Sequence, residues 1–432
     1  MKLNILLFLC LLGMKYHKLE YSIVTLGPIK PDKDNIVRTG LDVLLEDYPS
    51  YLKGKRIGLI TNQTGISRNN QKNYQLFQSN PDIFLKTIFA PEHGFHGEAS
   101  AGAKVIYDNH NISGPEIISL YGTTRRPTIE MLKEIDLIIY DIQDIGARFY
   151  TYISTLGMAM EAAGDFGIEF MVLDRPNPIG GEIFEGSILD TSFKSFVGYY
   201  PIPIRYGMTV GELTNMAINE KWLSSIPKEI TIVKMDGWKR SMFFDDTGLP
   251  WVAPSPNIPD LETAIIYPGM CLIEGTNISE GRGTRKPFKQ IGAPWITKIL
   301  IERLQNLSLN GVKIDFANFF PKSIPGKALN PKFENKICYG SSFEVTDKYK
   351  YRSLETGLYN LSMIKNLYEN KFQFTPNIIN KLYGNESLSN YLDNGTPSDE
   401  IEAGKYLFNF LAKERKDIEK FIKKSSKYFL YD

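Results

Sequence analysis

The residue types most able to do chemistry gather in the segment PEHGFHGE, residues 91–98. It holds two carboxylates and two of the chain's four histidines. Its first carboxylate, Glu92, lies three positions after the end of a hydrophobic run at residues 85–89. Loss of water at the end of such a run favours the protonated carboxyl group, which is the form that a general acid needs. Glu92 is therefore the first candidate catalytic residue.

The same segment allows two other interpretations. His93 and His96 are three residues apart beside Glu92 and Glu98, and zinc accepts imidazole and carboxylate ligands. The glycines between them disfavour a rigid helical pair, and the chain has no HExxH motif, so we expect no metal and no other cofactor. The remaining alternative is a turn held by local hydrogen bonds.

Four aliphatic runs of strand length predict the elements that position this segment. They span residues 56–60, 85–89, 136–140 and 169–173, and each is followed by a polar turn and a helix-like stretch. This alternation is typical of βα units with a parallel sheet. Because parallel strands end at one edge, we expect the polar segments that follow them to form one composite site.

Polar residues in these and later loops supply the other candidates. Asp141 and Asp144 are further candidate catalytic carboxylates, although Asp144 could instead cap the next helix and pair with Arg148. Arg282 and Arg285 could hold a carboxylate in bidentate fashion or be solvated surface residues. The candidate substrate-binding residues are Asn62, His93, His96, Arg148, Tyr152, Arg175, Asn177, Glu185, Arg205, Tyr206, Asn257, Glu274, Thr276, Arg282 and Arg285.

The fold class that we predict is α/β, with a Rossmann-like parallel-sheet domain over residues 36–228 and a smaller α/β (α+β) domain over residues 229–432 that closes the cleft. In the first domain, Thr209 and Glu212 predict a capping box at a helix start. In the second, we expect strands at residues 263–267 and 343–346. Helices are expected at residues 354–369 and 397–424.

Composition excludes several protein classes. The chain has 432 residues, with 50 Lys and Arg against 49 Asp and Glu, so it lacks the basic excess of a nucleic-acid-binding protein. Its three cysteines, Cys10, Cys271 and Cys338, form neither a disulfide framework nor a zinc motif. No stretch is long and apolar enough for a membrane helix.

Residues 1–25 predict a leader segment. The apolar run at residues 5–12 is too short to span a bilayer but fits the hydrophobic region of a signal peptide. This favours an exported, periplasmic protein. A cytoplasmic location is the alternative, because no small-residue cleavage site follows and Met14 is a possible second start.

Six ordered blocks together resemble one family. The chain is identified as a member of the DUF1343 family, which is associated with exo-β-N-acetylmuramidases of glycoside hydrolase family 171. Where members often read RHGMT, this chain has Tyr206 in place of the histidine. The blocks are PEHGFHGE, DIQDIGARFYTY, DRPNPIGG, PIPIRYGMTVGEL, SPNIPDLETAIIYPG and EGTNISEGRGTRKPF.

The resemblance implies a fold, a reaction and a site. It implies a Rossmann-like domain and a smaller C-terminal domain with the active site between them. The implied reaction removes terminal N-acetylmuramic acid (MurNAc) from the non-reducing end of MurNAc-β-1,4-GlcNAc or peptide-free peptidoglycan fragments, and these saccharides are the expected partner. Glu92 corresponds to the family's candidate catalytic residue.

Glycosidic cleavage needs a second group besides the acid, and several residues are open for that role. The candidates are Asp141, Asp144, Glu185 and Glu274, or the substrate's own 2-acetamido group. Selective binding of the lactyl carboxylate of MurNAc requires a cationic hydrogen-bond donor. The candidates for this donor are Arg175, Arg205, Arg282 and Arg285. Two alternative functions remain, a non-catalytic glycan-binding protein and a metal-dependent cell-wall hydrolase that uses His93 and His96.

Overall fold

The computed structural model describes the chain except residues 1–20, 30–35, 101, 104–106, 108–113 and 395–399. Most of the expected leader, residues 1–20, therefore lies outside the described residues. The end of that segment forms an edge strand, β1 (Ser22–Leu26), which pairs with β7 (Glu229–Val233). The first sheet thus begins before residue 36, where we expected the domain to start.

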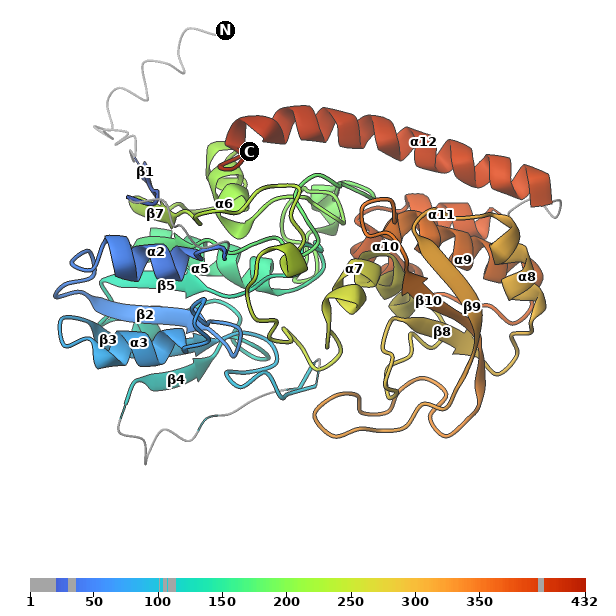
Figure 1. Ribbon diagram of the computed structural model, residues 1–432, viewed down its shortest axis with the longest axis horizontal. Helices are drawn as coiled ribbons and strands as arrows, with labels where there is room; N and C mark the ends of the chain where they lie inside the picture. Colours follow the sequence, from blue (N-terminus) through green and yellow to red (C-terminus); the bar gives the residue numbers. More distant parts are fainter. Residues whose placement is uncertain (1–20, 30–35, 101, 104–106, 108–113, 395–399) are drawn as a thin grey trace, which may run out of the picture.

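A seven-stranded parallel sheet forms the first domain, with strand order β1-β7-β6-β5-β2-β3-β4 (Figure 1). This confirms the Rossmann-like sheet and all four predicted aliphatic strands. The central strand β5 is buried along its whole length, which explains its continuous apolar run. The remaining strands are β2 (Arg56–Thr61), β3 (Phe84–Ala90), β4 (Glu116–Ser119), β5 (Leu137–Asp141) and β6 (Glu169–Leu173).

Helices cover both faces of this sheet. Ile138 and Tyr140 of β5 pack into one core with helices α5 (Tyr152–Phe166) and α6 (Val210–Asn219). Leu137 and Ile139 point to the opposite face, where they pack in a second core with α2 (Gly40–Asp47) and α3 (Asn73–Ser79). This alternation follows from the two-residue period of a strand. A short helix, α4 (Ile129–Leu132), precedes β5.

Local capping explains where α6 begins. Thr209 accepts a hydrogen bond from the Glu212 backbone N–H, and the Glu212 side chain accepts one from the Thr209 backbone N–H. The predicted capping box is therefore confirmed.

The second domain is built on an antiparallel sheet of order β8-β10-β9. The strand expected at residues 343–346 is confirmed as part of β10, and the helix expected at 354–369 is confirmed as α9. The start of the helix expected at 397–424 lies outside the described residues, and the rest is α12. The elements are β8 (Gln290–Ala293), β9 (Val312–Phe319), β10 (Cys338–Val345), α7 (Leu261–Met270), α8 (Ile299–Asn306), α9 (Ser353–Leu367), α10 (Pro376–Tyr383), α11 (Ser387–Asp393) and α12 (Glu400–Ser425). Four short 3-10 helices complete the described chain, η1 (Thr191–Phe193), η2 (Phe244–Asp246), η3 (Cys271–Gly275) and η4 (Ser426–Tyr428).

The strand predicted at residues 263–267 is wrong, because this segment lies in helix α7. Asp260 caps the helix by accepting a hydrogen bond of 2.8 Å from the Thr263 backbone N–H. The helix is buried on nearly all sides, and such a helix has the same continuous apolar pattern as a buried strand. Gly269 of α7 and Gly357 of α9 allow the close approach of the two helices, since a Cβ at Gly269 would lie 1.9 Å from the Ser353 carbonyl oxygen.

The two domains are joined by more than one segment. The first sheet extends past the domain boundary predicted near residue 228, because strand β7 begins at Glu229 and pairs with β6 of that sheet. The long helix α12 runs from the second domain back over the first (Figure 1). The chain end then bonds to the first domain, where the Tyr431 hydroxyl donates to Asp174 at 2.7 Å. In the described part of the chain, no helix meets the length and apolarity needed to cross a membrane.

Candidate active site

Glu92 follows β3 at the carboxyl edge of the large sheet and is almost completely buried, with 8% of its surface exposed. The Thr151 hydroxyl, just before α5, donates to Glu92 Oε2 at 2.7 Å, and the Gly102 N–H donates to Oε1 at 3.1 Å. Tyr121 also hydrogen-bonds to this carboxylate, and burial, followed by the charge of Glu92, raises the pKa of the tyrosine to about 12. The side chain of Glu92 is thus fixed by contacts from three loops.

The turn after β3 explains how Glu92 and His93 are presented. His93 has φ 71° and Gly94 has φ 76°, so two successive residues are left-handed. This conformation is costly for a histidine and is typical of functional sites, where surrounding contacts maintain it. The Gly94 N–H closes the turn by donating to the Pro91 carbonyl oxygen at 3.0 Å.

Glu92 and His93 line a cavity of about 110 Å³ between the two domains. From the second domain, Glu274 and Arg282 line the same cavity. A second cavity of about 510 Å³ shares Glu274 and Arg282 and adjoins the first. Its other lining residues include Ser100, Gly102, Glu280, Lys327 and Lys332. The predicted site at the carboxyl edge is therefore continuous with loops of the second domain.

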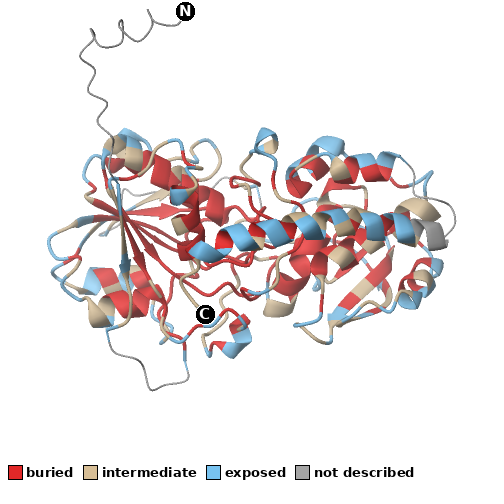
Figure 2. Ribbon diagram, turned by 90° about the horizontal axis from the view of Figure 1, so that it is seen from above, coloured by how far each residue is buried: buried red, intermediate tan, exposed pale blue. Residues whose placement is uncertain are grey.

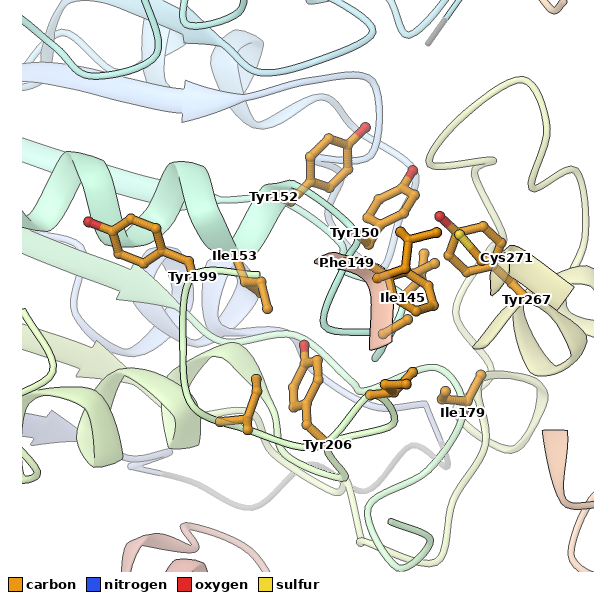
Figure 3. Packing of buried hydrophobic residues seen from close by; sticks show 14 of the residues in the cluster. Ile145, Phe149, Tyr150, Tyr152, Ile153, Ile179, Tyr199, Tyr206, Tyr267 and Cys271 are labelled. Atoms are coloured by element: carbon orange, nitrogen blue, oxygen red, sulfur yellow. The ribbon is translucent and has the colours of Figure 1, made fainter. Parts of the chain in front are cut away.

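Aromatic packing across the domains forms a wall of the first cavity. Tyr150 and Tyr267 both line it, with ring centroids 6.1 Å apart at an interplanar angle of 88°. Phe149 packs edge-on against Tyr267 at 5.4 Å. Figure 3 shows these rings in one cluster with Tyr152 and Cys271, so the wall is an extension of the hydrophobic core.

His93 is oriented by a hydrogen bond of 2.8 Å between its Nδ1 and the Ala99 carbonyl oxygen. Because a carbonyl oxygen only accepts, Nδ1 carries the hydrogen and the neutral ring keeps a lone pair on Nε2. Burial lowers the pKa of His93, the charge of Glu92 opposes this effect, and Arg282 adds to it. His93 is therefore neutral near pH 7 and can accept a hydrogen bond in the cavity.

Arg282 organises the carboxylates of the second domain. Its Nη2 lies 2.7 Å from Glu274 Oε1, and its Nε lies 3.6 Å from Glu280 Oε1. Burial lowers the pKa of Arg282, but the charges of Glu274 and Glu280 outweigh this effect, so the pKa lies above its usual value. Arg282 is therefore charged at all ordinary pH values, and it holds Glu274 in place through this ion pair.

Asp141 and Arg175 pair with each other and do not line the cavity. Arg175 Nε donates to Asp141 Oδ1 at 2.6 Å, and its Nη2 donates to Oδ2 at 3.0 Å. The Asn73 amide also donates to Asp141 at 2.7 Å. This buried bidentate pair holds the loops after β5 and β6 together.

Asp144 is also buried away from the cavity, and its partners do not include Arg148, with which one alternative paired it. Its Oδ2 accepts hydrogen bonds from the Tyr206 hydroxyl and from the Gly146 N–H. Burial raises the pKa of Asp144 to about 6, although these hydrogen bonds oppose the shift. Tyr206, which replaces the family's histidine, thus contacts a buried aspartate.

Arg148, a candidate substrate-binding residue, is fully buried, does not line the cavity and donates to four backbone carbonyl groups, so the alternative pairing with Asp144 is wrong as well. Its Nη1 reaches the carbonyls of Ser187 and Ile202, and its Nη2 reaches those of Leu382 and Tyr383. The second pair belongs to the C-terminal domain, so Arg148 connects the two domains.

Glu185 and Arg205 form a second interdomain contact. Arg205 Nη1 lies 3.3 Å from Glu185 Oε2. Glu185 also accepts hydrogen bonds from the backbone N–H groups of Ser353 and Leu354 at the start of α9. A carboxylate is favourable at this helix end, although burial still raises the pKa of Glu185.

The other predicted site residues fall into two groups, neither of which lines the cavity of Glu92. One group is buried and bonded to nearby backbone groups, as when the Tyr152 hydroxyl donates to the Pro254 carbonyl at 2.6 Å. The other group is exposed. The buried residues are Asn62, Tyr152, Asn177, Asn257 and Thr276, and the exposed ones are His96 and Arg285.

Several residues at the cavity were not predicted from the sequence. Thr151 and Tyr267 both lie within the motif blocks, but their types gave no signal of a role. Ser255 also lines the first cavity, and Lys332 lines the second. Among the described residues, no group of three or more His, Cys, Asp or Glu side chains is arranged to hold a metal ion.

The fold and the cavity together define a two-domain α/β protein with carboxylates from both domains at one interdomain site. Two family models match the chain, "Exo-beta-N-acetylmuramidase NamZ, N-terminal" at residues 57–262 and "Exo-beta-N-acetylmuramidase NamZ, C-terminal" at residues 265–431. The chain belongs to the exo-beta-N-acetylmuramidase NamZ family. The resemblance seen in the sequence is thereby confirmed.

Individual relatives agree with this assignment. The chain is 44% identical over 419 residues to the peptidoglycan beta-N-acetylmuramidase NamZ of Bacillus subtilis (strain 168), covering 95% of this chain and 97% of that protein. A crystal structure of a DUF1343 family protein from Bacteroides fragilis has a TM-score of 0.82 and 34% identity, covering 92% of this chain and 100% of that chain. A second B. fragilis DUF1343 structure has a TM-score of 0.70 and 32% identity, covering 92% and 99%. These structures confirm the fold class.

Proposed function

We propose that this protein is an exo-acting β-N-acetylmuramidase. It removes terminal MurNAc from the non-reducing end of MurNAc-β-1,4-GlcNAc or of peptide-free peptidoglycan fragments. Family membership and the name of the B. subtilis relative support the reaction. The observation that carries the proposal is that two carboxylates, Glu92 and Glu274, line one interdomain cavity.

Glu92 is the general acid that protonates the leaving glycosidic oxygen. The Thr151 hydroxyl and the Gly102 N–H hold its carboxyl group in one orientation. Orientation matters because proton transfer requires the acid to lie within hydrogen-bonding distance of the leaving oxygen.

Glu274 is the second group, which stabilises the positive charge that develops on the sugar in the transition state. It lines the cavity beside Arg282, whereas Asp141 and Asp144 are held in the interior by their own partners. Glu185 is likewise occupied at the start of α9. Attack by the substrate's 2-acetamido group is the alternative, and the Glu274 variant below separates the two.

Arg282 is the cation that contacts the lactyl carboxylate of MurNAc. Of the four arginines considered, Arg175 and Arg205 are buried in ion pairs and Arg285 is exposed outside the cavity. Arg282 contacts Glu274 through Nε and Nη2, so its Nη1 edge is not used in those contacts. A bidentate guanidinium suits recognition of a carboxylate.

The test compares a chromogenic β-MurNAc glycoside with its β-GlcNAc counterpart, with and without EDTA. Wild type is expected to release the chromophore from the MurNAc compound alone and to be indifferent to EDTA. Glu274→Gln is expected to lose about 100-fold or more in kcat, because it removes the charge that stabilises the transition state. Glu98→Gln is the matched control, since Glu98 is an exposed glutamate of the same loop.

Each other outcome contradicts a specific part of the proposal. Release from neither compound, together with measurable binding, favours a glycan-binding protein. Loss of activity in EDTA and recovery with zinc favours a metal-dependent hydrolase. Full activity of Glu274→Gln favours attack by the acetamido group.

We also propose that the protein is exported, to the periplasm in a cell with two membranes. The apolar run at residues 5–12 supports this proposal. Signal-peptide cleavage before Ser22 would leave strand β1 intact, whereas cleavage after residue 25 would remove most of this strand. N-terminal sequencing of the protein from cell fractions tests this. An uncleaved chain in the cytosol contradicts it.

A further inference from the structure

We propose that a groove beneath helix α12 is a second binding site, separate from the cavity of Glu92, for chains of N-acetylated sugars that carry carboxylates. The groove has a volume of about 1090 Å³, and no residue that lines it lines the cavity of Glu92. This proposal rests on the proposed function, because that function supplies the class of ligand.

Three parts of the chain build the groove. One wall is α12, which lies across both domains with its outer face exposed (Figures 1 and 2). Another wall is α11 with the residues just before it, and the third is formed by residues 186–188, Pro201 and Trp222 of the first domain. A site at a domain interface with walls from several elements is typical of ligand binding.

Aromatic rings supply flat apolar surfaces in the groove. Tyr391 of α11 and Tyr406 of α12 are stacked, with centroids 5.0 Å apart and an interplanar angle of 15°. Phe410 packs on Tyr391 at 5.0 Å. Tyr406 remains 39% exposed, so its ring is accessible to a ligand. Such rings can cover the apolar face of a sugar and keep a polar edge toward water.

Carboxamides supply hydrogen-bonding groups in the same groove. The side-chain amide nitrogen of Asn385 is available to donate to a ligand. Its side-chain oxygen accepts from the Ser387 N–H and hydroxyl, and among the described residues no acceptor bonds the nitrogen. Carboxamides both donate and accept, as hydroxyl and acetamido groups of sugars require. Four asparagines line the groove, Asn385, Asn390, Asn394 and Asn409.

Charge complementarity favours an anionic sugar. Three lysines and two acids line the groove, and two of the lysines have acidic partners: Lys420 bonds to Asp417 at 3.0 Å, and Lys424 to Glu220 at 2.6 Å. Lys413 is exposed on the groove side of α12. Lactyl carboxylates along a peptidoglycan strand match this cation.

The groove and the cavity share a structural connection. Arg148 donates to the carbonyl of Ser187, which lines the groove, and to that of Leu382, which lines the cavity. A chain held in the groove raises the local concentration of its ends at the cavity, as in other two-site binding.

Binding of a MurNAc-GlcNAc hexasaccharide, measured by calorimetry in the Glu92→Gln background, tests the proposal. Tyr406→Ala is expected to weaken binding about 5-fold. Phe408→Ala is the matched control, because Phe408 is 54% exposed on the same helix but does not line the groove. Lys413→Glu is expected to weaken binding about 3-fold, whereas Lys416→Glu, also exposed on α12 and outside the groove, leaves it unchanged.

A second readout separates this proposal from the proposed function. With Glu92 intact, Tyr406→Ala and Lys413→Glu are expected to hydrolyse the chromogenic β-MurNAc compound at the wild-type rate. Unchanged hexasaccharide affinity in both groove variants overturns the second site, whether or not the protein is hydrolytic. Lack of hydrolysis by wild type, with binding weakened in both groove variants, overturns the proposed function and leaves the groove as a glycan site.

Discussion

Replacement of Arg148 by methionine should destabilise the protein without a direct effect on substrate contacts. The sequence suggested a substrate-binding arginine, but the side chain is fully buried and connects the two domains. Its guanidinium donates to four carbonyl oxygens at distances of 2.6–2.9 Å, two in each domain. Methionine keeps much of the apolar volume and removes all four donors.

The expected loss follows from the groups left without partners. Two of the four carbonyls keep another donor, since Ile202 accepts from the Leu189 N–H and Tyr383 accepts from the Ser187 hydroxyl. A buried polar group that loses its partner costs about 1–3 kcal/mol, so the carbonyls of Ser187 and Leu382 give an upper limit of roughly 2–6 kcal/mol. Two effects reduce this figure. Burial of the charge lowers the pKa of Arg148 to about 9, so removal of the charge relieves a desolvation cost. Water can also replace some of the donors. We therefore expect a net loss of about 3 kcal/mol.

Equilibrium unfolding in guanidinium chloride at pH 7 measures this loss. Arg126→Met is the matched control, because Arg126 forms an exposed ion pair with Asp165 and should change the free energy of unfolding by no more than about 0.5 kcal/mol. A loss below about 1 kcal/mol for Arg148→Met, combined with a raised KM, would refute the structural role and restore the sequence-based interpretation.

Two further predictions concern stability. The pKa of Asp144, raised to about 6 by burial, means that the folded state holds this proton more tightly than the unfolded state, so stability falls as pH rises from about 4 to 6. Asp144→Asn should abolish about 3 kcal/mol of this pH dependence, measured as the difference in free energy of unfolding between pH 4 and pH 7; an unchanged slope contradicts it. Gly269→Ala should cost about 3 kcal/mol, because its Cβ would lie 1.9 Å from the Ser353 carbonyl oxygen; a wild-type melting temperature contradicts the close packing of α7 on α9.

Much of the fold could be predicted from the sequence, because in the first domain the pattern of apolar residues in each strand matches the burial of that strand in the sheet. Residues 137–140 of the predicted aliphatic run are buried on both faces, as a central parallel strand requires. The prediction of a strand at residues 263–267 was wrong because a helix buried on nearly all sides has the same run of apolar residues as a buried strand. A buried helix can be distinguished from a buried strand by its greater length and by its capping residue, here Asp260, only when the ends of the helix are recognised in the sequence.

The site was predictable in location but not in detail. Position after a strand identified the loop of Glu92, because parallel strands end at one edge. The same rule selected Asp141, Asp144 and Arg175, whose partners in the structure hold them inside the protein. Which polar side chains pair with one another depends on distances between loops that are far apart in the sequence. Thr151 contacts Glu92 across 59 positions of sequence, so its role became visible in three dimensions.

The most direct test of the central claim is the dependence of Glu92→Gln on the leaving group. An acid is needed to expel a sugar alkoxide but not a dinitrophenolate, which is stable without a proton. We predict that Glu92→Gln loses roughly 10³-fold in kcat on MurNAc-β-1,4-GlcNAc and less than about 10-fold on dinitrophenyl β-MurNAc. Equal losses on both substrates, or wild-type rates on the disaccharide, would contradict the role of Glu92 as the general acid.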